Sequence, residues 1–283
     1  MFGMYNKRMT KHLLYYICVS VGLPFMGFAD GIVSLGSAVT EIIVALDAEE
    51  RLVGIDDSSV LSQELSQLPQ VGYYRMVSAE GVLSVQPGMI ISSEDAGPPE
   101  ALKKIKNSGV TVIQVPAEKT LAGTVNRIRS IGKALEAGEA AESLLKPVEE
   151  RMQDPLKPLA PEPKVLFIYA RGGGAPNVSG TGTGADEMIR LAGAKNAVDG
   201  FKGYRPLTPE ALVTCQPDVL LMTRQGLDAM GGEKALWTLP GMQNTPAGKH
   251  SRIVVMDEVL LLGFGPRVVD AIDQLNAALK VEK

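Results

Sequence analysis

Short apolar runs alternate with segments of helical periodicity along most of the chain. In the first third, apolar runs at 32–35, 51–55, 89–91 and 110–115 are separated by amphipathic stretches. Strands that alternate with helices predict a parallel sheet covered by helices. The same alternation restarts with an apolar run at 164–170 and closes with a strand at 252–256 and a helix at 266–279. The pattern therefore predicts an α/β protein.

One phrase of this pattern occurs twice, at residues 74–87 and 204–217. Each copy begins with Tyr-Arg, continues with a hydroxyl residue (Ser78 or Thr208) and a glutamate, and ends in Gln-Pro before an apolar run. These signals predict a short capped helix that leads into a strand. The two copies lie much farther apart than the repeats of a solenoid. We therefore expect two similar lobes with a ligand cleft between them.

The stretch between the two copies has a different periodicity. Apolar residues recur at helical spacing from about residue 120 to 152, with charged residues between them. Gly138 and Pro147 leave open whether this stretch is one helix or two. The expected fold is α/β, with two parallel-sheet, Rossmann-like lobes joined by a long interlobe helix. The expected segments are a signal peptide at 1–29, an N-terminal lobe at 30–118, the helix at 119–154 and a C-terminal lobe at 155–283.

The first thirty residues have the organisation of an export signal. An uncharged apolar run at 13–28 follows the positive charges of Lys7, Arg8 and Lys11. The small residues Gly27 and Ala29 stand at its end. This arrangement is typical of a cleaved signal peptide. A transmembrane anchor is the alternative, but a spanning helix needs about 20 apolar residues. We therefore expect a periplasmic protein. After cleavage Cys215 is the only cysteine, which excludes an internal disulfide.

Composition and motifs argue against several function classes. A net charge of -4 over 283 residues does not suit a nucleic-acid groove. His250 is the one histidine of the mature chain, so neither a multi-histidine metal site nor a catalytic Ser-His-Asp set can be assembled. The paired acids Asp56-Asp57 and Glu94-Asp95 are expected to be solvated loop residues. The chain is therefore not expected to be an enzyme.

A nucleotide-dependent enzyme is the remote alternative. Residues 180–185 fit the Gly-x-Gly-x-x-Ala form of a dinucleotide turn, open a helix, and have Asp199 downstream. However, this turn begins well beyond the expected strand at 164–170, whereas the fingerprint belongs directly after a strand. We expect the loop to lie at a helix N-terminus that lines the cleft.

Tyr73 and Arg75 have the chemistry of a ferric iron site. A phenolate is a hard anionic ligand, but its free pKa of about 10 leaves it protonated at neutral pH. A guanidinium two residues away lowers that pKa and keeps the phenolate available. Tyrosine is also a known haem ligand. Without further context, aromatic packing at a lobe surface explains these residues equally well.

The wider phrase around these residues resembles a known signature. Residues 71–81 are similar to the first-lobe signature of periplasmic haem-binding proteins of bacterial haem-uptake ABC transporters. Further matches extend over nearly the whole mature chain, at 32–37 with Thr40 and Glu41, and at 172–176, 204–208 and 262–267. The resemblance implies that haem is a transported ligand, that Tyr73 binds its iron and that Arg75 hydrogen-bonds the tyrosine. We take Tyr74, Arg171, Tyr204 and Arg205 as further haem contacts.

The resemblance also implies that the protein has a membrane permease and its ATPase as partners. Relatives dock on an inner-membrane permease dimer, driven by its ATPase, through one glutamate per lobe, and Glu80 and Glu210 occupy the matching places. A glutamate favoured by the helix dipole explains these positions as well.

Some relatives add a second-lobe histidine ligand, which this chain lacks in that region. A monomer is expected. A carrier of ferric siderophores or of corrinoids, the vitamin B12 type, is the alternative within the same fold.

Overall fold

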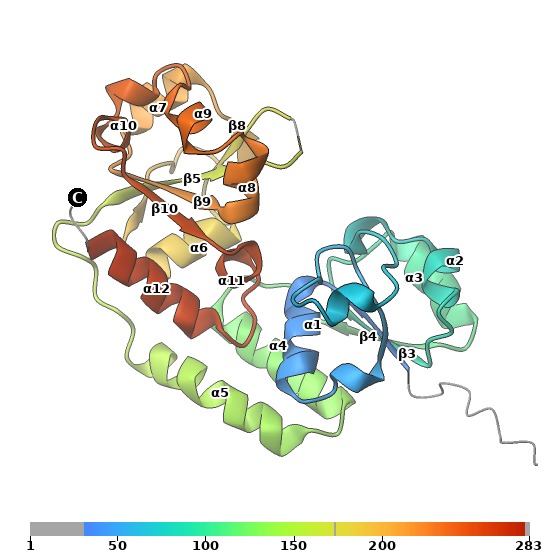
Figure 1. The fold of residues 1–283 in the computed structure, drawn as a ribbon. Helices are drawn as coiled ribbons and strands as arrows, with labels where there is room; N and C mark the ends of the chain where they lie inside the picture. Colours follow the sequence, from blue (N-terminus) through green and yellow to red (C-terminus); the bar gives the residue numbers. More distant parts are fainter. Residues whose placement is uncertain (1–30, 173, 281–283) are drawn as a thin grey trace, which may run out of the picture.

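The computed structural model describes residues 31–172 and 174–280. The expected signal peptide lies outside these residues. Within them, no helix has the length and apolar character that crossing a membrane requires. Figure 1 shows a first lobe, coloured blue to cyan, beside a second lobe, coloured yellow to red, with green helices below and between them.

The first lobe contains a four-stranded parallel sheet in the order β2-β1-β3-β4. Its strands are β1 (Ile32–Leu35), β2 (Leu52–Ile55), β3 (Met89–Ser93) and β4 (Thr111–Val115). Its helices are α1 (Ser37–Ala45), α2 (Ala79–Leu83) and α3 (Pro99–Asn107), with short 3-10 turns between β1 and α2. This is the parallel α/β arrangement that the sequence predicts.

The second lobe contains a six-stranded sheet in the order β10-β9-β5-β6-β8, with β7 beside β5. Its strands are β5 (Lys164–Tyr169), β6 (Asn177–Ser179), β7 (Lys195–Asn196), β8 (Tyr204–Pro206), β9 (Val219–Thr223) and β10 (Ile253–Met256). Its helices are α6 (Gly184–Leu191), α7 (Pro209–Cys215), α8 (Arg224–Ala229), α9 (Glu233–Trp237), α10 (Pro246–Lys249), α11 (Glu258–Leu262) and α12 (Val268–Lys280).

The α/β class and the two sheets are confirmed, but the second sheet is mixed. Strand β6 runs antiparallel to both β5 and β8. The cause is the glycine-rich connection after β5, which contains no helix and returns the chain directly beside the strand it has just left. A parallel partner would need a crossover of a dozen or more residues, usually a helix.

The two copies of the repeated phrase form equivalent structures. The Ser78 hydroxyl accepts from the Gly81 amide at 2.8 Å to cap α2, and the Thr208 hydroxyl accepts from the Ala211 amide at 3.2 Å to cap α7. Each helix then turns through a left-handed glutamine into a proline and a central strand, β3 or β9. The capped helix leading to a strand is therefore confirmed in both lobes.

Two helices, not one, make the link between the lobes. Helix α4 (Leu121–Ala134) ends at residues 135–137, where Glu136 has a φ of 58°, and α5 (Gly138–Gln153) then returns beside it. Gly132 permits this close packing, because a Cβ there would lie 2.4 Å from that of Ala141. Pro147 lies inside α5 without ending it. From α5 the chain passes through a proline-rich segment to β5.

A continuous hydrophobic core joins the two lobes through these helices. One cluster of buried side chains contains Ile42 from α1, Ile128 from α4, Phe167 from β5 and Ile272 from α12. Two further clusters cover the other face of each sheet. Because close-packed interiors resist deformation, the shared core holds the lobes in a defined relative position.

Polar contacts reinforce this junction. Arg267, just before α12, forms an ion pair with the buried carboxylate of Glu41 in α1. The Phe264 carbonyl accepts from the Thr124 hydroxyl at 2.9 Å and from Arg127 Nη1 at 2.7 Å. Burial raises the pKa of Glu41, and the contact with Arg267 opposes that shift. The second lobe is therefore fastened to α1 of the first lobe and to the linking helix α4.

Replacing Arg267 with alanine is expected to destabilise the fold in a pH-dependent way. The change leaves the Glu41 carboxylate buried without its partner, which we expect to lower the free energy of unfolding by about 1–3 kcal/mol at about pH 8. The Glu41 pKa is already raised in the folded state and should rise further in the variant. The folded variant then binds a proton as the pH falls through that pKa, so its loss of stability should shrink at about pH 5.

Urea unfolding followed by circular dichroism at both pH values checks this result. Arg129→Ala is the control, because Arg129 pairs with Glu142 and Glu149 at the surface and such pairs contribute about 0–1 kcal/mol. An Arg267→Ala loss that is as small as the control, or equal at the two pH values, would contradict a buried role for this pair.

Candidate functional site

Tyr73, Tyr74 and Arg75 lie on a firmly held loop between β2 and α2. Gly72 has a φ of 94°, a conformation that favours glycine, and this turns the chain at the end of the sheet. Tyr73 is extended, and a 3-10 turn (Tyr74–Met76) follows. Backbone hydrogen bonds then tie this turn to Gly97, with the Gly97 amide on the Tyr74 carbonyl at 2.9 Å. The two tyrosine rings meet edge to face at 5.0 Å.

Arg75 connects the Tyr73 phenol to a carboxylate. Its Nη1 donates to the Tyr73 hydroxyl at 3.5 Å, and its Nη2 forms an ion pair with Asp95. Burial opposes the charge of Arg75, but the hydrogen bond to Asp95 raises its pKa overall. A permanent positive charge therefore lies beside the Tyr73 oxygen, as the sequence predicts from the spacing.

Asp95 organises the polar groups on this loop. It accepts from Ser93 at 2.5 Å and from the Tyr74 hydroxyl at 3.4 Å, in addition to Arg75. Burial opposes its charge, yet the hydrogen bonds from Ser93 and Arg75 keep the pKa of Asp95 below its ordinary value. The expectation that Glu94-Asp95 is a solvated acidic pair is wrong for Asp95, because the strand end at Ser93 and the cation at Arg75 enclose it. The expectation also fails for Asp56, which is fully buried and accepts from the Gly36 amide at 2.8 Å.

The two adjacent tyrosines differ in their chemistry. Burial and the neighbouring Asp95 charge raise the pKa of Tyr74, so its phenol stays protonated and donates to that carboxylate. Tyr73 is only partly buried, and among residues 31–172 and 174–280 its one hydrogen bond comes from the Arg75 guanidinium. Of the two phenol oxygens, that of Tyr74 is therefore committed to a carboxylate and that of Tyr73 is not.

Residues of the second lobe complete the cluster. The guanidinium carbon of Arg171 lies 5.4 Å from the centre of the Tyr73 ring, so this contact crosses between the lobes. The Tyr204 ring lies 5.7 Å from that of Tyr169. Arg205 faces elsewhere and stacks over Phe201 at 4.6 Å. The structure thus gathers the predicted residues Tyr73, Tyr74, Arg75, Arg171 and Tyr204 and leaves Arg205 at the margin.

Tyr169 was not foreseen from the sequence. It is the last residue of β5, next to the glycine-rich loop, and lies between Phe167 and Tyr204. The available signal was its position, because ligands of open α/β sheets bind beyond the carboxyl ends of the strands.

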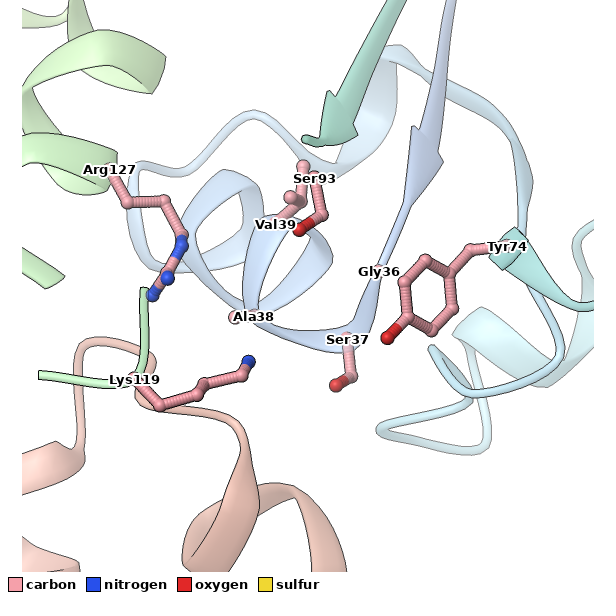
Figure 2. Close-up of a pocket in the computed structure, with 8 residues that line it drawn as sticks. All are labelled: Gly36, Ser37, Ala38, Val39, Tyr74, Ser93, Lys119 and Arg127. Atoms are coloured by element: carbon pink, nitrogen blue, oxygen red, sulfur yellow. The ribbon is translucent and has the colours of Figure 1, made fainter. Parts of the chain in front are cut away.

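A polar pocket adjoins this cluster (Figure 2). Tyr74 forms one of its walls, Ser93 another, and Lys119 and Arg127 enclose it on the side of α4; its full lining is Gly36, Ser37, Ala38, Val39, Tyr74, Ser93, Lys119 and Arg127. Lys119 lies in the loop before α4 and points toward the start of α1. Burial, and then the charge of Arg127, lower the pKa of Lys119 to about 8.

The glycine-rich turn at 180–185 has a structural explanation. It follows β6 directly, but β6 is antiparallel to its neighbours and so does not begin a dinucleotide-binding unit. A Cβ at Gly180 would lie 2.2 Å from the Phe201 carbonyl oxygen, and the Gly182 amide donates to Asp186 at 2.9 Å. Close packing at Gly180 and the positive φ of Gly182, 73°, therefore account for these two glycines.

Glu80 and Glu210 occupy equivalent places on α2 and α7. Both are exposed and stand in the first turn of their helices. Neither takes part in an ion pair among residues 31–172 and 174–280. His250 is exposed at the end of α10, and the described part of the chain has no group of three His, Cys, Asp or Glu side chains that could hold a metal ion.

Comparison with known proteins identifies relatives over most of the chain. Residues 32–260 match the model of the family described as periplasmic binding protein. The periplasmic heme-binding protein RhuT from Roseiflexus sp. RS-1, solved in its apo form, is 39% identical, with 88% of this chain and 97% of that chain covered and a TM-score of 0.81.

Two curated relatives are more distant. The ABC transporter substrate-binding lipoprotein YvrC of Bacillus subtilis is 29% identical, with 88% of this chain and 79% of that protein covered. The vitamin B12-binding protein of Vibrio cholerae is 22% identical, with 89% and 90% covered.

Proposed function

Since this chain belongs to the periplasmic binding protein family, we propose that it binds ferric haem between its lobes in the periplasm and delivers it to an ABC permease dimer. Proteins of this family are transport components, so the chain is not an enzyme. Haem is its cargo and not a catalytic cofactor. Tyr73 binds the iron through its phenolic oxygen, and Arg75 donates a hydrogen bond to that oxygen.

The observation that carries this proposal is the contrast between the two tyrosines. Tyr74 is committed to Asp95, whereas Tyr73 has a guanidinium beside its oxygen. A positive charge at hydrogen-bond distance favours the anionic form of a phenol. Arg171 lies over the Tyr73 ring from the second lobe, so a ligand that reaches Tyr73 meets both lobes. The similarity to RhuT supports haem as the ligand.

A corrinoid carrier is the second candidate, supported by the vitamin B12-binding relative. Such a ligand has no need of a tyrosine with a cationic neighbour. The identity is also lower, 22% against 39% for the haem-binding neighbour. The Tyr73-Arg75 arrangement therefore favours haem.

Titration of the purified protein with ferric haem, followed by absorption spectroscopy, tests the proposal. We expect a shifted Soret band with a high-spin ferric charge-transfer feature, because a phenolate oxygen is a weak-field ligand, and a single equivalent of haem at saturation. Cyanocobalamin in excess should not displace the haem. An unchanged spectrum of free haem, together with tight binding of cyanocobalamin, would instead establish the corrinoid carrier.

A further inference from the structure

The pocket beside Tyr74 contains more positive charge than the protein itself neutralises. Arg127 is 1% exposed, and its three nitrogens donate to the carbonyls of Pro116, Glu118 and Phe264 at 2.7, 2.8 and 2.7 Å. Lys119 Nζ donates to the Gly263 carbonyl at 3.2 Å. Neither cation forms an ion pair with a carboxylate of the described residues. Two neighbouring cations thus share the pocket, and the carboxylates of residues 31–172 and 174–280 pair with neither.

Lys119 keeps donor capacity for a ligand. An ammonium group has three N–H donors, and one of them is used by Gly263. The stem of Lys119 lies beside Gly184 of the second lobe, where an added Cβ would be 3.4 Å from its Cγ. Figure 2 shows the ammonium group directed toward the start of α1. Asp95, which influences both cations from a distance, is already bound by Arg75 and Ser93.

The opposite wall of the pocket also offers donors. The first intrahelical hydrogen bonds of α1 come from the amides of Val39 and Thr40, whereas the amides of Ser37 and Ala38 find no acceptor within residues 31–172 and 174–280. Ala38 is 6% exposed. Buried backbone donors normally have a hydrogen-bond partner. These two amides and the two cations can therefore all interact with an acceptor group in the pocket.

We propose that this pocket is the subsite for a carboxylate of the bound ligand, and that a haem propionate occupies it with Lys119 as its main partner. The inference rests on the proposed function and adds the part of haem that is recognised here. Tyr74 lines the pocket and its ring lies 5.0 Å from that of Tyr73, so the pocket adjoins the residue that is proposed to bind the iron. The free space, about 30 Å³, suits a carboxylate head and not a whole ring.

Ligand chemistry makes this subsite selective. Haem carries two propionate carboxylates on one edge, whereas the peripheral side chains of a corrin ring are neutral amides. A half-buried cation that meets a neutral amide is left without its counter-charge, which costs binding energy. The pocket should therefore favour haem over a corrinoid and over a porphyrin whose carboxylates are esterified.

The test compares ferric haem with its dimethyl ester on the wild type and on three variants. Lys119→Met removes the charge, Lys119→Arg keeps it, and Lys133→Met removes an exposed lysine from the far end of α4 as a control. We expect Lys119→Met to weaken haem binding roughly ten- to hundredfold, as for a charge-assisted hydrogen bond. It should leave binding of the ester and the iron spectrum unchanged. Lys119→Arg and Lys133→Met should bind haem within a few-fold of the wild type.

Two results would overturn the subsite. The first is equal affinity of the wild type for haem and for its dimethyl ester. The second is a Lys119→Met variant whose affinity falls by the same factor for both ligands. In either case a tyrosinate spectrum of the wild-type haem complex would show that the proposed function survives. Absence of haem binding by the wild type would remove both. The wild-type comparison of haem with its ester does not depend on the folding of any variant.

Discussion

Replacing Tyr73 with phenylalanine is expected to abolish the tyrosinate spectrum of the haem complex and to cause the largest loss of haem affinity of any single substitution in the site. Loss of a group that orients a metal ligand typically lowers metal affinity ten- to hundredfold. We expect roughly that loss for Arg75→Ala, whose guanidinium contacts the Tyr73 oxygen. Tyr73→Phe removes the ligand atom itself and should cost more. Haem titration by absorption and fluorescence quenching measures both.

Tyr74→Phe is the matched control. It removes a hydroxyl from the adjacent residue, whose phenol already donates to Asp95, and should preserve the tyrosinate band. The repeated phrase makes an error of assignment possible, because Tyr74 and not Tyr73 corresponds to Tyr204. If Tyr73→Phe binds haem like the wild type while Tyr74→Phe or Tyr204→Phe does not, the iron ligand is a different tyrosine.

Features set by local sequence were predictable. The capped helices α2 and α7 follow from Ser78 and Thr208, whose hydroxyls reach the amide three residues on. The strands that come next, β3 and β9, follow from unbroken apolar runs after Gln-Pro. Because each signal lies within one turn or strand, the duplication of the phrase was enough to predict two lobes.

Features set by distant partners were not predictable. Asp95 reads as a solvated loop acid, and only the fold brings Arg75 and Tyr74 to it. Nothing in the sequence distinguishes Lys119 from other loop lysines, yet in the fold it lies against Gly184 and Gly263 of the second lobe. The direction of β6 also depends on how a long loop returns to the sheet. For Asp95 and Lys119 the deciding contacts join residues at least 20 positions apart, which the local sequence does not reveal.

The continuity between the lobes bears on how cargo is released. The core that includes Ile42, Ile128 and Ile272 spans the junction, and Arg267 bonds across it. A large hinge motion would break this packing, so the lobes should move little on binding. In the proposed function, release at the membrane then depends on contacts that the permease makes with each lobe. The exposed residues Glu80 and Glu210 are the candidates for these contacts.

Reversing the charge of Glu80 and Glu210 together is expected to abolish most haem transport while leaving haem binding intact. Both glutamates are exposed, in equivalent first turns, one on each lobe. Figure 1 shows α2 and α7 on separate lobes, as docking to a permease dimer requires. A single exposed charge pair contributes about 0–1 kcal/mol. Two such pairs that set the register of one interface should have a larger joint effect on encounter and orientation.

Transport by the reconstituted permease with its ATPase measures this effect, with haem affinity determined in parallel. Glu80→Arg and Glu210→Arg should each reduce transport, and the double variant should reduce it most. The control is Glu100→Arg with Glu233→Arg, because these exposed glutamates also stand in first turns, of α3 and α9, and lose the same favourable contact with the helix dipole. Normal transport by the Glu80/Glu210 variant, or an equal loss in the control, would mean that these positions serve their helices and not the permease.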